Sequence, residues 1–90
     1  GRLVGPGDPE AQARQVFENV RANLAAAGAG FADVVKMTGF VTDFAHMAAI
    51  RRVRADYVDA DGPPVSTVVL VPRFADPAML LEIDVVAALA

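Results

Sequence analysis

The segment LLEIDVVA, residues 80–87, decides the fold, because it lies in a predicted strand, Met79–Ala88, that is apolar on both faces. Successive side chains of a strand point to opposite faces, so Glu82 shares a face with Leu80, Asp84 and Val86. A strand that is apolar on both sides is typical of a sheet covered by other layers. A carboxylate in that setting is costly unless it is paired, protonated or used in chemistry. Glu82 is therefore the first candidate functional residue.

Two further strands are predicted upstream of this segment. The turn-forming run Asp61–Pro64 leads into a strand over Val65–Val71, which is also apolar on both faces. Asp33–Thr42 is a third strand, because its residues alternate between two faces. The two predicted faces of this third strand are Val35, Met37, Gly39 and Val41 on one side and Val34, Lys36, Thr38 and Phe40 on the other.

Two amphipathic helices are predicted between these strands and in front of them. Asp8 is a favourable N-cap for the first helix, with Pro9 at its first position, and Gly28 and Gly30 end it. Asp43 caps the second helix in the same way. Apolar stripes at helical spacing comprise Ala13, Val16, Phe17, Val20, Leu24 and Ala27 in the first helix and Met47, Ile50, Val53 and Tyr57 in the second.

The order helix, strand, helix, strand, strand predicts an α+β fold with a mixed sheet and two helices packed on one face. The strand–helix–strand unit should be parallel with a right-handed crossover. Two helices cover only one face of such a sheet, and the strands are apolar on the other face as well. We therefore expect the second face to pack against another subunit, and residues 1–90 to form a single domain.

Composition excludes several functional classes. Hydrophobic residues make up 54% of the 90 residues, more than a small core can bury, which also favours an oligomer. The chain has no cysteine and one histidine, so thiolate chemistry and a multi-histidine metal site are excluded and no metal is expected. The net charge of −3 argues against a nucleic-acid partner. No apolar run is long enough to span a membrane and no signal peptide is recognisable, so we expect a cytoplasmic protein.

Several segments in the right order resemble the Rid family, the reactive intermediate deaminases of the YjgF type. Gln12–Gly28 is similar to the first helix of that family, and Asp33–Thr38 with Phe40–Asp43 is similar to its central strand. The segment at Glu82 resembles the family's Glu-Ile-Glu segment, and Pro63–Val68 resembles its Pro-Ala-Arg-Ser segment. Family members begin with a strand hairpin, of which this chain would hold at most the tail. We therefore expect the domain to be incomplete at its N-terminus.

The resemblance implies a chorismate-mutase-like fold, a homotrimer with active sites in clefts between subunits, and cofactor-free hydrolysis of enamines or imines. Glu82 would be the catalytic residue that handles water or delivers a proton. Val65 stands where the family has an arginine that binds a substrate carboxylate. Ser66 and Thr67 match positions whose backbone groups line the family's pocket. Two other readings remain open: Glu82 as an interface glutamate paired with an arginine, and Val65 as a core strand residue.

Arg51 and Arg73 are candidate replacements for the missing arginine. Arg51 falls near a second-helix position that is often Asn in the family, and Arg73 lies in the loop before the last strand. The alternative for Arg51 is a solvated helix face, where the basic residues are balanced by Asp56 and Asp59.

The sequence leaves three candidate functions. The first is an enamine or imine hydrolase with an altered substrate range, which Glu82 favours. The second is a non-catalytic relative that binds a small molecule or a protein partner in the cleft, which Val65 favours. The third, ribonuclease activity as attributed to some relatives, is disfavoured by the acidic net charge.

Overall fold

A computed structural model describes residues 5–89 and has the predicted order of helices and strands. The expected hairpin tail at Gly1–Val4 lies outside the described residues. The main elements are α1 (Pro9–Ala26), β1 (Val34–Val41), α2 (Met47–Arg54), β2 (Val65–Leu70) and β3 (Leu81–Ala87). Short 3₁₀ helices at Phe31–Asp33 and Phe44–His46 precede β1 and α2. None of the helices in this part of the chain has the length and apolarity needed to cross a membrane.

The helix boundaries follow from local chemistry. The carboxylate of Asp8 accepts a hydrogen bond from the backbone N–H of Ala11 at 3.1 Å, as an N-cap does. Gly28 has a positive φ of 76°, and α1 ends just before it. The second helix is shorter than its apolar stripe suggested, because Tyr57 lies in the turn after α2. The ring of Tyr57 still packs on the core, stacking on Phe17 at 5.1 Å between centroids.

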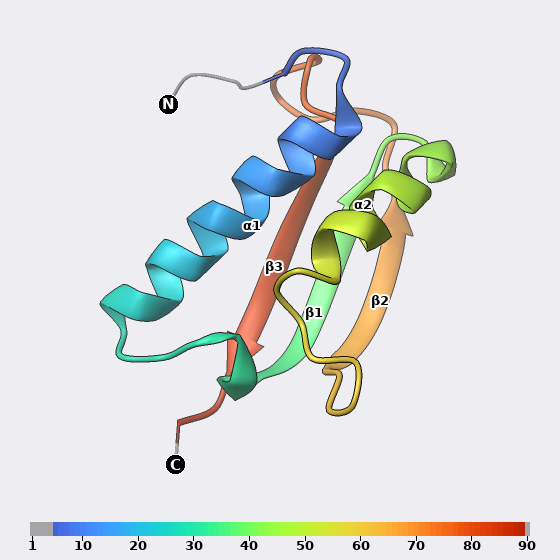
Figure 1. Cartoon of the computed structure of the whole chain (residues 1–90). Coiled ribbons are helices and arrows are strands. Elements are labelled where there is room, and N and C mark those ends of the chain that lie inside the picture. Colours follow the sequence, from blue (N-terminus) through green and yellow to red (C-terminus); the bar gives the residue numbers. More distant parts are fainter. Residues whose placement is uncertain (1–4, 90) are drawn as a thin grey trace.

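The three strands form one mixed sheet in the order β2-β1-β3 (Figure 1). β1 and β2 are parallel, while β1 and β3 are antiparallel. Figure 1 shows α2 in front of the sheet and β2 to the right of β1, so the crossover through α2 is right-handed, as predicted.

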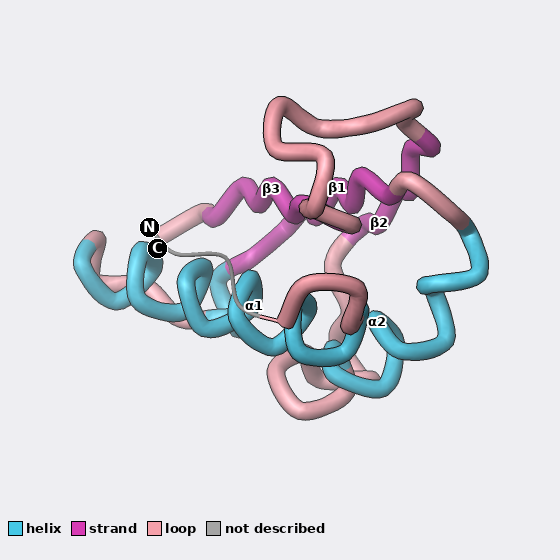
Figure 2. The backbone as a smooth tube through the Cα atoms, turned by 90° about the horizontal axis from the view of Figure 1, so that it is seen from above, coloured by secondary structure: helices cyan, strands magenta, loops and turns pink. Residues whose placement is uncertain are grey.

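Both helices lie on the same face of the sheet (Figure 2). The core lies between these two layers, and its largest fully buried side chains are Phe17, Val41, Val53 and Leu81. We call the opposite side of the sheet the open face, because no element of residues 5–89 covers it. The strand register assigns nine residues to the open face: Lys36, Thr38, Phe40, Val65, Thr67, Val69, Glu82, Asp84 and Val86.

Two sequence expectations about burial are wrong for the single chain. Every residue of β2 is exposed, and the Val65 side chain is 69% exposed, so Val65 is not a core residue. The alternation predicted for β1 also breaks at its start. A register shift lies between Val34 and Lys36, so Val34 is buried beside α1 while Val35 is 49% exposed. A β-bulge of this kind adds one residue and exchanges the two faces.

Gln12 is a buried polar residue that the apolar stripe did not reveal. Gln12 lies in the first turn of α1 and is only 3% exposed. Its amide nitrogen donates to the carbonyls of Gly5 and Ala78 at 3.2 and 3.0 Å, and its amide oxygen accepts from Leu80 N–H at 2.8 Å. These three bonds hold the loop before β3 against α1, and they fix where the strand that carries Glu82 begins.

Candidate functional site

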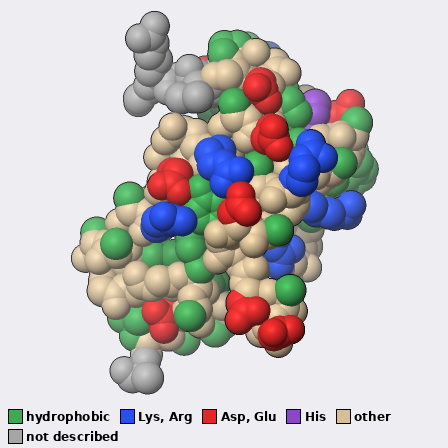
Figure 3. All heavy atoms as spheres, in the orientation of Figure 1, with side chains coloured by type: hydrophobic (Ala, Val, Ile, Leu, Met, Phe, Trp, Pro, Cys, Tyr) green, Lys and Arg blue, Asp and Glu red, His purple; other side chains and the backbone are tan. Residues whose placement is uncertain are grey.

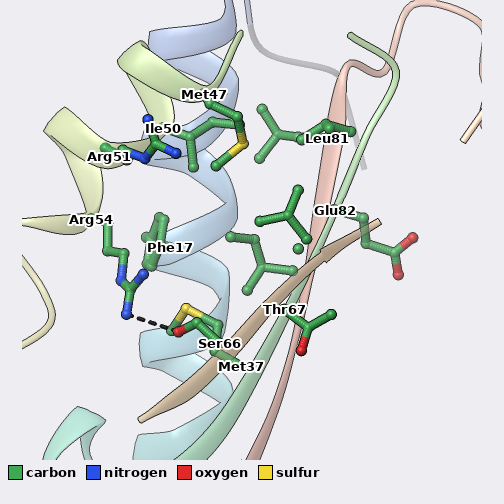
Figure 4. Close-up of a pocket in the computed structure, with 14 residues that line it drawn as sticks. Phe17, Met37, Met47, Ile50, Arg51, Arg54, Ser66, Thr67, Leu81 and Glu82 are labelled. Carbon is green, nitrogen blue, oxygen red and sulfur yellow. Dashed lines mark hydrogen bonds between the residues drawn. The ribbon is translucent and has the colours of Figure 1, made fainter. Parts of the chain in front are cut away.

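Glu82 lies on the open face of β3, opposite Phe40 of β1 in the register. Figure 4 shows its carboxylate pointing away from the helices and from the cavity beside them. The residue is exposed, so the expected burial of this carboxylate is wrong for the single chain. Among residues 5–89 no arginine or lysine forms an ion pair with Glu82. Its carboxylate is therefore available to a ligand or to a neighbouring chain.

Val65 and Glu82 lie at opposite ends of the open face. Val65 is paired with Lys36, whereas Glu82 is paired with Phe40, four residues further along β1. That offset amounts to about 13 Å along the strand, and the two strand spacings add about 10 Å across it. The two residues are therefore about 16 Å apart in one chain by this geometry. A small substrate cannot contact both unless a second chain supplies one of them.

Thr67 and Lys36 also lie on the open face. Thr67 is paired with Thr38, midway along the sheet between the levels of Val65 and Glu82. Lys36 is exposed and is the direct cross-strand neighbour of Val65. Sequence reasoning had placed Lys36 on one face with Thr38 and Phe40, but it did not give the strand pairing. The parallel register identifies Lys36 as a cation beside the position where the family has arginine.

Ser66 and Arg51 lie on the helix side of the sheet instead. Ser66 is paired with Met37, whose side chain is buried under the helices. Arg54 of α2 donates from Nη2 to Ser66 Oγ at 2.9 Å. Arg51 lines the same cavity from α2 (Figure 4). The predicted site residues are thus divided between the two faces, and Arg51 does not lie beside Val65 of its own chain.

Arg73 lies in the loop between β2 and β3, near the end of the sheet where Glu82 is found. Its side chain is exposed, and Nε donates to the carbonyl of Phe74 at 3.4 Å. No cluster of three or more histidine, cysteine, aspartate or glutamate side chains in residues 5–89 could hold a metal ion. The polar side chains that the described residues offer on the open face are those of Lys36, Thr38, Thr67, Glu82 and Asp84.

Comparisons with known proteins agree with this fold. The model of the family described as Endoribonuclease L-PSP matches residues 1–89. The RutC family protein slr0709 of Synechocystis is 39% identical over 87 residues, which are 97% of this chain and 66% of that protein. The chain thus spans about two thirds of the length of this curated relative.

Two further proteins are similar to this chain, one in structure and one in sequence. The crystal structure of Rv2704 from Mycobacterium tuberculosis, of the YjgF/YER057c/UK114 family, superposes with a TM-score of 0.87 at 31% identity. That match covers 96% of this chain and 71% of Rv2704. The protein of Escherichia coli named "Putative reactive intermediate deaminase TdcF" is 43% identical over 54 residues, or 60% of this chain and 42% of TdcF. The family match over nearly the whole chain and the shared fold confirm the resemblance: this chain belongs to the Rid (YjgF-type) family, whose model is described as Endoribonuclease L-PSP.

Proposed function

We propose that this protein hydrolyses enamines or imines at the open face of the sheet, with Glu82 as the catalytic residue. The observation that carries the proposal is an exposed carboxylate on an uncovered sheet face, shared by apolar and polar side chains, in a Rid-family chain. The name of TdcF adds support, since it describes a deaminase of reactive intermediates. We further propose that three chains assemble through their open faces and that the site lies in the cleft between neighbours. The distance between Val65 and Glu82 within one chain favours such an arrangement.

The proposed reaction is addition of water across a C=N bond. Glu82 takes a proton from the attacking water as the C–O bond forms and the π electrons move to nitrogen. The nitrogen is then protonated and leaves as ammonia while the carbonyl forms. An enamine first takes a proton on carbon to become the imine. Nothing is oxidised or reduced, so the proposed hydrolysis needs no cofactor.

The substrate range follows from the residues at the other end of the open face. Valine at position 65 offers no charge to a substrate carboxylate, whereas arginine would bind it through two parallel hydrogen bonds. Lys36 supplies a point charge next to Val65 and is a weaker replacement. Thr67 would contribute backbone donors and acceptors to the wall of the pocket. We therefore propose substrates with a weakly held carboxylate or none.

The direct test is ammonia and carbonyl release from a freshly generated imine. Glu82→Gln, which keeps the size of the side chain, should lower the rate by about 10²–10⁴-fold, the usual contribution of a general base. Light scattering after size exclusion should show the same molar mass for both proteins. If Glu82→Gln loses assembly as well as activity, Glu82 is an interface residue and the catalytic proposal fails.

Val65 favours a second function, in which the protein binds a small molecule or a partner in the cleft without catalysis. The Val65→Arg variant distinguishes the two functions. If the unaltered protein is inactive on 2-imino acids and Val65→Arg gains activity, the catalytic machinery is intact and only the substrate range has changed. If both proteins are inactive on imines with and without a carboxylate, the binding function is supported.

Figure 3 shows acidic and basic side chains interspersed on the helix face, an arrangement that disfavours a ribonuclease.

A further inference from the structure

A cavity of about 240 Å³ lies between α2 and the helix side of the sheet. Thr67 and Glu82 also belong to its lining, but the Glu82 carboxylate points away from the cavity to the other side of the strands (Figure 4). Its walls include the apolar side chains of Met37, Met47, Ile50 and Leu81. The cavity is far larger than the roughly 30 Å³ that one water molecule occupies in the liquid, so it has room for an organic ligand.

The cavity owes part of its volume to Gly39 in the middle of β1. A Cβ atom placed on Gly39 would meet only Val68 Cγ2, at 4.0 Å, which is ordinary van der Waals contact. Any other residue on this strand position would fill the space with its side chain. The central strand thus leaves a hollow under α2, where the neighbouring positions Met37 and Val41 are almost completely buried.

Two arginines stand at the edge of this apolar cavity without a carboxylate partner. In the part of the chain that the structure describes, the ion pairs join Arg14 to Asp56, Arg21 to Glu18 and Arg52 to Glu10. Arg51 and Arg54 take part in none of them. Arg54 is half-buried and bonds only to the neutral hydroxyl of Ser66. Guanidinium groups of this kind bind carboxylates through charge-assisted hydrogen bonds.

We propose that this cavity is a second ligand site, which binds a monocarboxylate with a short hydrocarbon chain. The hydrocarbon would lie against Met47, Ile50 and Leu81 and remove apolar surface from water. The carboxylate would pair with Arg54 and Arg51, and Ser66 Oγ would hold the Arg54 guanidinium in place. The site combines an apolar wall and unpartnered positive charge, and an anion with an apolar tail complements both.

Isothermal titration of the protein with hexanoate tests this site. Arg51→Gln and Arg54→Gln should each weaken binding about tenfold, as expected when one charge-assisted hydrogen bond is lost. Arg52→Gln is the matched control, because Arg52 is paired with Glu10 and does not line the cavity. That control should leave the affinity for hexanoate unchanged. Hexanol should bind at least tenfold more weakly than hexanoate, since it lacks the charge.

A variant that fills the cavity tests where the hydrocarbon lies. A Cβ on Gly39 meets no atom closer than 4.0 Å. Circular dichroism checks that Gly39→Val is folded, and the folded variant should not bind hexanoate. Unchanged binding in Gly39→Val, equal binding of hexanol, or unchanged affinity in the double variant of Arg51 and Arg54 would each overturn the proposal. Hexanoate binding is measured without an imine substrate, so the result does not depend on the proposed hydrolase activity.

Discussion

The chemistry of single residues depends here on which side of the sheet each one occupies. Alternation along the last strand correctly placed Glu82 with Asp84 and Val86, because the period of a strand is fixed by its backbone. It was wrong for Leu80, which precedes β3 and packs against the buried core. Alternation could not give the pairing between strands, since that depends on contacts far apart in the sequence. The neighbourhood of Lys36 and Val65 therefore emerged only from the structure. The predicted site residues could be listed from the sequence, but their division between two faces could not.

Lys36 provides a prediction about substrate choice. Replacing Lys36 with Gln should weaken the binding of carboxylate-bearing imines and leave uncharged imines unaffected, because only the former gain from the ammonium group. The ratio of kcat/KM for the two substrate types measures this effect, and we expect it to fall about tenfold. Arg52→Gln is the control, because Arg52 is an exposed residue of α2 that is paired with Glu10. An equal loss for both substrate types would show that Lys36 does not recognise the carboxylate.

Gln12 provides a prediction about stability. Gln12→Ala leaves the Leu80 N–H and two carbonyls without their partner and should lower the free energy of unfolding by about 2 kcal/mol. Urea denaturation measures the change. Gln15→Ala is the matched control on the same helix, because the Gln15 side chain bonds only to Asn19 at the surface. A similar effect of both variants would mean that the buried hydrogen bonds of Gln12 contribute little.

Among the elements, the helices could be predicted more closely than the strands. The start of α1 at Asp8 and Pro9 follows from capping chemistry, which depends on residues next to each other in the sequence. The face assignment at the start of β1 failed, because a bulge depends on the partner strand rather than on local sequence. The consequence is a pair of adjacent valines with opposite environments.

These two valines test the bulge. Val34→Ala should lower the free energy of unfolding by about 2 kcal/mol, because Val34 is buried against Val20 and Leu24. Val35→Ala should change it by less than about 0.5 kcal/mol, as is usual for exposed positions. Thermal or urea unfolding of both variants gives the comparison. The opposite ranking would mean that Val35 rather than Val34 is buried, as simple alternation predicts, and that β1 has no bulge at this point.

For the whole molecule, the fold leaves one sheet face uncovered in residues 5–89. The high apolar content predicts an oligomer from the sequence, and we propose the open face as its interface. Val69 and Val86 are 38% and 56% exposed on that face. The number of chains in the assembly stays a prediction, because burial in one chain does not count its partners.

A charge on the open face should disrupt the proposed trimer. Val69→Glu would bury an unpaired carboxylate in the interface, so the protein should dissociate to monomers at micromolar concentration. Phe44→Glu is the control, because Phe44 is also exposed but lies in the 3₁₀ helix before α2, outside the sheet. Sedimentation velocity distinguishes the two. A trimer that persists in Val69→Glu would mean that the chains associate elsewhere.

The outer edge of β2 carries a hazard of its own. Val65–Leu70 contains no charged residue, and within the described chain only β1 pairs with it, so its other edge offers free N–H and C=O groups. Apolar uncharged segments at a free sheet edge are templates for cross-β aggregation. Pro63 and Pro64 precede the strand, and proline lacks the N–H that an incoming strand needs. We expect these two prolines to act as gatekeepers: an incoming strand can pair with Val65–Leu70 but cannot continue its pairing past Pro64.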